Sequence, residues 1–133
     1  MPNRKKLKRT LIMGLALAVG VIYPAHATAP KLEIRQVHKA IALTEPKTYA
    51  KIKMAKYGWG KNQSKCLNML WGKESAWNHL ADNPTSTAFG IAQMLGETST
   101  DPMKQIINGL RYIEHRYGTP CNAWKYWQRN KWY

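Results

Sequence analysis

The side chain in this sequence best placed for chemistry is Glu74, because its spacing puts it on an apolar helical face. Leu67, Leu70 and Trp71 precede it by seven, four and three residues, the spacings of one face of an α-helix. Burial on such a face disfavours the charged form of a carboxyl group and raises its pKa. An acid that is protonated near neutral pH can donate a proton to a leaving glycosidic oxygen. The alternatives are a structural glutamate paired with a cation such as Lys73 or Arg111, or a glutamate that simply lies at the exposed end of its helix.

A second carboxylate would decide between two kinds of glycosidic chemistry. Hydrolysing glycosidases use two acids, about 5–5.5 Å apart for retention and about 6.5–9.5 Å apart for inversion. Asp101 is expected to cap a helix and Glu114 to face solvent. Asp82 and Glu97 flank the segment that is expected to form a substrate groove, so they stay candidates for the second carboxylate. Because neither is a clear partner for Glu74, the pattern favours a mechanism with a single acid.

Helices are the elements predicted to position these residues. Apolar side chains at helical spacing predict a first helix over residues 31–43, and Pro46 separates it from a second, strongly basic helix over residues 48–57. A third helix, which carries the acid, is expected to begin at Asn62 or Ser64, because either side chain can cap the first free amide groups. This helix is expected to run to about residue 76.

The segment after the third helix has a different pattern. Residues 78–96 lack helical periodicity, and Asn83-Pro84 is a turn signal within them. We therefore expect a loop followed by a short β-hairpin or extended segment near residues 85–95. The fold class predicted from the whole pattern is mainly α.

Start and stop signals delimit two further helices. Asp101-Pro102 predicts a helix start, with Asp as N-cap and Pro in the first turn, and Gly118 predicts its end. Thr119-Pro120 repeats the start signal for a last helix, which leads into an aromatic tail. The fourth helix has a clear apolar stripe, formed by Met103, Ile106, Ile107, Leu110, Ile113 and Tyr117.

The amino terminus has the features of an export signal. Five basic residues precede residue 10, an uncharged apolar run covers residues 11–23, and Ala25-His26-Ala27 offers a cleavage site. We predict a signal peptide over residues 1–27 and a secreted or cell-envelope location, with an uncleaved anchor as the alternative. In an exported chain, Cys66 and Cys121 are expected to form a disulfide.

The charge balance indicates a polyanionic partner. The chain has 21 basic and 7 acidic residues, and removing residues 1–27 takes away 5 basic ones, which leaves 16 minus 7, or +9. Such a field attracts nucleic acid, anionic lipid or the anionic polymers of a cell wall. Because an exported protein rarely meets nucleic acid, envelope polymers are the favoured partner.

Several motifs together resemble one enzyme family. Glu74-Ser75-Ala76-Trp77-Asn78, followed by Ala88-Phe89-Gly90-Ile91-Ala92-Gln93, is similar to the soluble lytic transglycosylase pattern. That pattern has a Glu-Ser pair, a downstream Asn or Ser turn and a Gly-Leu/Ile-x-Gln segment. Residues 105–113 and 116–124 resemble a branch of small secreted or phage-associated wall-cleaving domains. The resemblance covers residues 62–133 and leaves residues 28–61 as a basic helical amino-terminal segment.

The resemblance implies a lysozyme-like helical fold of the goose type and an activity on peptidoglycan. In this family the matching glutamate protonates the leaving oxygen of the β-1,4 bond between N-acetylmuramic acid and N-acetylglucosamine. It then acts as a base while the muramoyl 6-hydroxyl closes a 1,6-anhydro end. The implied partner is a glycan strand, with anionic wall polymers as a further candidate, and the protein is expected to be a monomer without metal or cofactor.

The resemblance also assigns roles around Glu74. Ser75 would orient the acid or its substrate, Gln93 would hold an acetamido or hydroxyl group, and the Gly90 backbone would let a sugar approach closely. Ser75 bonding its own helix and Gln93 as an ordinary polar residue are the alternatives. Further residues expected to contact substrate are Asn83, Ser86, Ile91 and Tyr112.

One motif departs from the family pattern, and other functions stay open. The family has a late tyrosine near the acid, where this chain has Asn122-Ala123-Trp124. Tyr112 and Tyr117 are the candidates for an equivalent hydroxyl, with packing in the core as the alternative for both. A lysozyme-type hydrolase using Asp82 or Glu97 is the second candidate. A wall-binding module without activity and a cationic membrane-active protein are the others.

Overall fold

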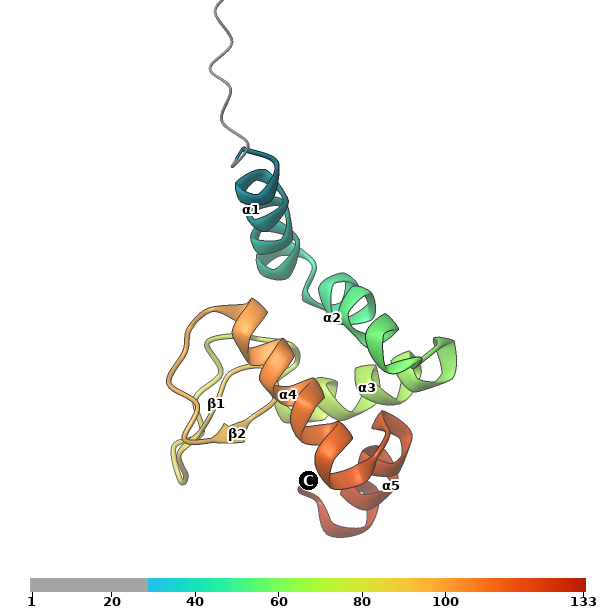
Figure 1. Ribbon diagram of the computed structural model, residues 1–133. Helices are drawn as coiled ribbons and strands as arrows, with labels where there is room; N and C mark the ends of the chain where they lie inside the picture. Colours follow the sequence, from blue (N-terminus) through green and yellow to red (C-terminus); the bar gives the residue numbers. More distant parts are fainter. Residues whose placement is uncertain (1–28) are drawn as a thin grey trace, which may run out of the picture.

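The computed structural model describes the backbone of residues 29–133 and the side chains of residues 33–133. This part of the chain is mainly helical (Figure 1). The predicted signal peptide, residues 1–27, lies outside the described residues. The elements in chain order are α1 (Ala29–Thr44), α2 (Pro46–Met54), a 3-10 turn η1 (Ala55–Tyr57), α3 (Lys61–Glu74), β1 (Ala88–Phe89), β2 (Met94–Leu95), α4 (Pro102–Tyr117) and α5 (Pro120–Asn130).

The predicted fold class and element order are confirmed at the level of a mainly α fold with one small hairpin. Strands β1 and β2 pair antiparallel, with Ala88 opposite Leu95 and Phe89 opposite Met94. They lie within the segment that lacked helical periodicity. The first two helices also form where they were expected, and Pro46 occupies the first turn of α2.

The predicted capping of α3 is wrong. The helix begins at Lys61, its N-cap is Gly60 in an extended conformation, and no side chain caps it. Asn62 and Ser64 already lie inside the helix, and the Ser64 N–H donates to the carbonyl of Gly60. The helix also ends at Glu74, because Ala76 and Trp77 adopt positive φ angles of 51° and 65° that turn the chain away.

The predicted start and end of α4 and the predicted start of α5 are confirmed. Asp101 Oδ1 accepts a hydrogen bond from the Met103 N–H at 2.9 Å. Thr119 Oγ1 accepts one from the Asn122 N–H at 3.3 Å. Gly118, with φ of 73°, ends α4 and its N–H donates to the Glu114 carbonyl. These caps satisfy amide and carbonyl groups that a helix end would leave unpaired.

One hydrophobic core joins the basic amino-terminal helices to the rest of the chain. Tyr49, Ala50 and Met54 of α2 belong to the same buried cluster as Trp71 of α3 and the apolar stripe of α4. The backbone of α4 approaches this core closely at Gly109, where a Cβ would lie 2.6 Å from Trp71 Cζ2. Glycine is therefore needed for this helix contact.

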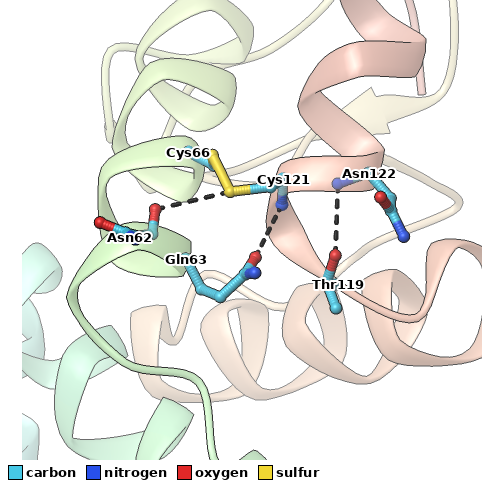
Figure 2. Close-up of a disulfide and its surroundings, with 6 residues drawn as sticks. All are labelled: Asn62, Gln63, Cys66, Thr119, Cys121 and Asn122. Atoms are coloured by element: carbon cyan, nitrogen blue, oxygen red, sulfur yellow. Dashed lines mark hydrogen bonds between the residues drawn. A yellow bond between two sulfur atoms is a disulfide. The ribbon is translucent and has the colours of Figure 1, made fainter.

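The predicted disulfide between Cys66 and Cys121 is formed, and it joins α3 to the start of α5 (Figure 2). Gln63 Oε1 accepts a hydrogen bond from the Cys121 N–H at 2.9 Å beside it. Cys121 Sγ lies 3.5 Å from the Asn62 carbonyl oxygen. This contact is not a hydrogen bond, because the sulfur is bonded to Cys66 Sγ and carries no hydrogen. The disulfide and the Gln63 bond together attach α5 to the helix that carries Glu74.

Replacing both cysteines by serine is expected to lower the free energy of unfolding by about 2–4 kcal/mol, because the bridge closes a long loop in the unfolded chain. The cysteines are 55 residues apart in sequence. Urea unfolding of the variant and of the wild type measures the loss. The reduced wild type serves as the control and should match the double variant, and an unchanged unfolding midpoint would contradict the prediction.

Candidate functional site

Glu74 is the last residue of α3, next to the buried face formed by Leu67, Leu70 and Trp71. The predicted placement on an apolar face is therefore confirmed. Its Oε1 atom is buried and has no hydrogen-bond partner among the described residues. The alternative role, a structural glutamate paired at this oxygen with a neighbouring cation, has no support in this arrangement.

Burial controls the protonation of this carboxyl group. Desolvation raises the pKa of Glu74, and the nearby Trp127 side chain partly opposes the rise by favouring the charged form. Because burial penalises the charged form more than Trp127 stabilises it, this environment shifts the equilibrium of Glu74 toward the neutral acid. A neutral acid near neutral pH is the requirement for proton donation to a leaving group.

Glu74 opens into a cavity of about 360 Å³. Three residues that the sequence predicted as substrate contacts, Asn83, Ser86 and Gln93, line this cavity together with the acid. They come from the loop before β1 and from the turn of the hairpin. The other lining residues are Ala88, Leu95, Lys131, Trp132 and Tyr133.

Local hydrogen bonds hold Asn83 and Ser86 in the cavity wall. Asn83 Oδ1 accepts from the Thr85 N–H and hydroxyl, each at 3.0 Å. Ser86 Oγ accepts from the Ala88 N–H at 3.2 Å. These side-chain turns fix the loop and leave the Asn83 amide nitrogen and the Ser86 hydroxyl proton as donors for a ligand.

Gln93 is held with a defined orientation. Its Nε2 donates to the carbonyls of Ala81 at 3.0 Å and of Gly90 at 2.9 Å. Both amide hydrogens are thereby used, which leaves Oε1 as an acceptor on the cavity side. The residue has a positive φ of 49°, a conformation that non-glycine residues rarely adopt. Such strain at a cavity wall is typical of functional positions.

Three other residues predicted to contact substrate are used inside the protein. Ser75 Oγ donates to the Ile91 carbonyl at 2.7 Å and accepts from the Trp77 N–H at 3.1 Å. Ile91 is fully buried. A Cβ on Gly90, whose φ is 77°, would lie 2.3 Å from Gln105 Cδ. Ser75, Gly90 and Ile91 therefore join the Glu74 helix, the hairpin and α4, and they do not line the cavity.

Gln105 is a positioning residue that the sequence analysis did not single out. It is a fully buried polar side chain whose Oε1 accepts from the Ile91 N–H at 3.0 Å. Its Nε2 donates to the carbonyls of His79 and Ser99. These bonds attach the loops on both sides of the hairpin to α4. The sequence signal that could have indicated this role is a glutamine on the apolar face of a predicted helix.

Tyr133, and not Tyr112 or Tyr117, is the tyrosine that lines the Glu74 cavity. Its hydroxyl accepts a hydrogen bond from Trp71 Nε1 and donates one to the Ala92 carbonyl, each at 2.7 Å. Burial raises the pKa of this hydroxyl well above its ordinary value. The neutral hydroxyl is fully engaged, so Tyr133 forms a wall of the cavity. The sequence showed only an aromatic tail, which packing or sugar stacking could equally explain.

Tyr112 lies outside the Glu74 cavity and borders two hollows beside it. Its hydroxyl accepts a hydrogen bond from Arg116 Nη1 at 2.9 Å. The Arg116 guanidinium also lies over the rings of Tyr112, Tyr117 and Trp132, at 5.3 to 5.8 Å from their centroids. This cation holds the aromatic cluster at the end of α4.

Neither candidate for a second carboxylate lines the Glu74 cavity. Asp82 is exposed and forms an isolated β-bridge with Phe89. Glu97 lines a different pocket, and its carboxylate accepts from the Ser99 N–H at 2.8 Å and from Asn108 Nδ2 at 3.0 Å. Glu74 is thus the one carboxylate among the residues that line its cavity.

Two kinds of feature, a metal-binding group and a membrane-spanning helix, are absent from the residues that the structure describes. No group of three or more His, Cys, Asp or Glu side chains within them could hold a metal ion. None of their helices combines the length and the apolar character needed to cross a membrane.

Comparison of the whole chain with protein-family models, curated proteins and solved structures finds no match.

The raised pKa of Glu74 predicts a pH-dependent effect on stability. The pKa of Glu74 in the folded protein lies above its ordinary value of 4.5. The neutral acid therefore contributes its full stability below pH 4.5, and this contribution is lost as the pH rises through the folded-state pKa. Glu74→Gln removes this loss. The variant's Tm should exceed that of wild type by about 1–4 °C at pH 7, since partial exposure screens the effect.

Thermal unfolding of both proteins between about pH 3.5 and 8 measures this difference, which should disappear at the acidic end. Glu114→Gln, a change of an exposed carboxylate on α4, is the matched control and should show no such pattern. A Tm difference for Glu74→Gln that is the same at all pH values would contradict the burial argument.

Tyr133→Phe is expected to lower the free energy of unfolding by about 1–3 kcal/mol, because Trp71 Nε1 and the Ala92 carbonyl would lose their shared partner. Chemical denaturation measures the loss. Tyr126→Phe removes a hydroxyl from the neighbouring aromatic cluster, outside this bridge, and is the control. Equal stabilities of wild type and Tyr133→Phe would show that the bridge contributes nothing.

Proposed function

We propose that this protein is an exported peptidoglycan lytic transglycosylase with a lysozyme-like fold, and that Glu74 is its catalytic acid and base. The substrate is the β-1,4 bond between N-acetylmuramic acid and N-acetylglucosamine, and the product carries a 1,6-anhydromuramoyl end. The observation that carries the proposal is the buried, unpartnered Oε1 of Glu74 beside a polar cavity. The motif resemblance supplies the substrate.

The environment of Glu74 fits the first step of this reaction. Desolvation favours the neutral acid, which donates its proton to the glycosidic oxygen as the bond to the anomeric carbon breaks. The carboxylate left behind then accepts the proton of the muramoyl 6-hydroxyl as that oxygen bonds to the anomeric carbon. One group serves both steps, the proton count balances, and water is not consumed.

The cavity walls fit an amino sugar. Gln93 presents an acceptor oxygen suited to an acetamido N–H, and Asn83 and Ser86 offer donors to its carbonyl or to hydroxyl groups. Trp132 and Leu95 line the same cavity and are 51% and 75% exposed, which provides apolar surface for the faces of sugar rings. Aromatic and apolar walls with a few fixed polar groups are typical of ligand sites.

The position of the other acids favours transglycosylation over hydrolysis. A two-acid hydrolase needs its second carboxylate within about 9.5 Å, across the same cleft. Asp82 and Glu97 do not line the Glu74 cavity, and Glu97 is held by Ser99 and Asn108 in the wall of another pocket. The one-acid reaction requires no partner, so it agrees with this arrangement.

Wild-type protein is expected to clear a suspension of peptidoglycan, and Glu74→Gln should slow clearing by about a hundredfold to ten-thousandfold because it removes the acid and base. Turbidity measures the rate, and sedimentation with peptidoglycan shows whether the variant still binds. Asp82→Asn is the matched carboxylate control and should keep wild-type activity. Full activity of Glu74→Gln would overturn the proposal.

Mass spectrometry of the released fragments separates the remaining functions. An anhydromuramoyl end supports the proposed reaction, whereas a reducing end heavier by one water, lost in Asp82→Asn or Glu97→Gln, identifies a hydrolase. Binding without release of any fragment by wild type would identify a wall-binding module. Leakage of lipid vesicles without fragment release would identify a membrane-active protein.

A further inference from the structure

Three hollows that share lining residues adjoin one another along the hairpin and α4, and together they are called the groove below. The Glu74 cavity shares Gln93, Leu95, Trp132 and Tyr133 with a second hollow of about 270 Å³. This second hollow shares Met94, Leu95 and Tyr112 with a third of about 470 Å³. Figure 1 shows the hairpin beside α4, and residues of α4 line the third hollow. The third hollow is called the distal pocket below, and its lining is completed by Gly96, Glu97, Asn108, Arg111 and His115.

The chemistry of the walls changes along this groove. Close to Glu74 the walls combine uncharged polar side chains with the rings of Trp132 and Tyr133. The one basic side chain there is Lys131, whose ammonium lies 5.4 Å from the centroid of the Trp127 ring. In the distal pocket they carry charge of both signs, from Arg111 and Glu97, beside the imidazole of His115. Neutral sugar rings suit the first part of the groove, but they provide no charged partner for the charged side chains of the distal pocket.

The polar groups of the distal pocket are arranged along one helical face. Asn108, Arg111 and His115 follow one another on α4 at intervals of three and four residues, so they lie side by side. Both oxygens of Glu97 already accept hydrogen bonds from Ser99 and Asn108. The forked guanidinium of Arg111 is therefore the strongest donor for an incoming ligand, and its geometry matches a carboxylate.

We infer that the distal pocket binds the short peptide carried by the muramoyl group, with Arg111 holding one of its carboxylates. The inference rests on the proposed function, because it takes the occupant from the chemistry of peptidoglycan. Among the parts of that polymer, the peptide is the one that carries carboxylates and ammonium groups together. These match Arg111 and Glu97, and the peptide branches from the sugar chain, as a pocket beyond the sugar-binding part of the groove requires.

The test uses the Glu74→Gln protein, in which cleavage is blocked, and measures binding by calorimetry. The two probes are a muramoyl disaccharide with its tetrapeptide and the same disaccharide without the peptide. The peptide-bearing probe should bind more tightly, and Arg111→Gln should weaken it by about tenfold while leaving the peptide-free probe unchanged. Lys104→Gln, which removes an exposed positive charge from α4 outside the pocket, is the matched control.

Two outcomes would overturn the inference. One is equal binding of the two probes, and the other is an equal loss of both in Arg111→Gln. Competition by a glycerol phosphate polymer but not by the free tetrapeptide would assign the pocket to wall phosphate instead. Because binding is measured without cleavage, these outcomes are distinct from failure of the proposed reaction, which appears as a wild-type protein that releases no fragments.

Discussion

The hydrogen-bond bridge at the Tyr133 hydroxyl is the interaction on which the candidate site depends. It joins Trp71 in the Glu74 helix to the Ala92 carbonyl in the hairpin, through a residue 62 positions further along the chain than Trp71. The disulfide attaches α5 to the same helix from its other end. Together they bring the aromatic tail against Glu74, so the acid is enclosed while its Oε1 has no hydrogen-bond partner.

That enclosure has a cost for the fold. A buried carboxyl oxygen without a partner is unfavourable when charged, and the carboxyl avoids the charge by a raised pKa. The donors of Ser75 and Gln93 are used elsewhere, since Ser75 donates to the Ile91 carbonyl and Gln93 to the carbonyls of Ala81 and Gly90. Among the described residues, Tyr49, Trp77 and Tyr117 also have a buried polar atom without a partner, and Glu74 Oε1 is the one that belongs to a carboxyl group. Proteins tolerate such defects mainly at functional sites.

The basic charge of the chain and the walls of the groove would act at different distances on the proposed substrate. The groove begins at an aromatic, mostly neutral cavity and ends at a pocket with Arg111, Glu97 and His115. A polymer of amino sugars with charged peptide branches has the same alternation. The general positive charge would attract an anionic wall at long range, whereas the groove would select its occupant by short contacts.

The sequence by itself determined the features that depend on near neighbours or on a simple pairing. These include both ends of α4, the start of α5, the apolar face before Glu74, the hairpin segment and the disulfide. The cap of α3 was mispredicted because Gly60 begins the helix without a side chain that could signal it. Only the tertiary structure decided which motif residues face the cavity. Asn83, Ser86 and Gln93 do so, whereas Ser75 and Gly90 are used in packing and Tyr133 arrives from the end of α5. The reason is physical: helix caps follow from bonds within four residues, but the burial of a single oxygen depends on segments brought together from across the chain.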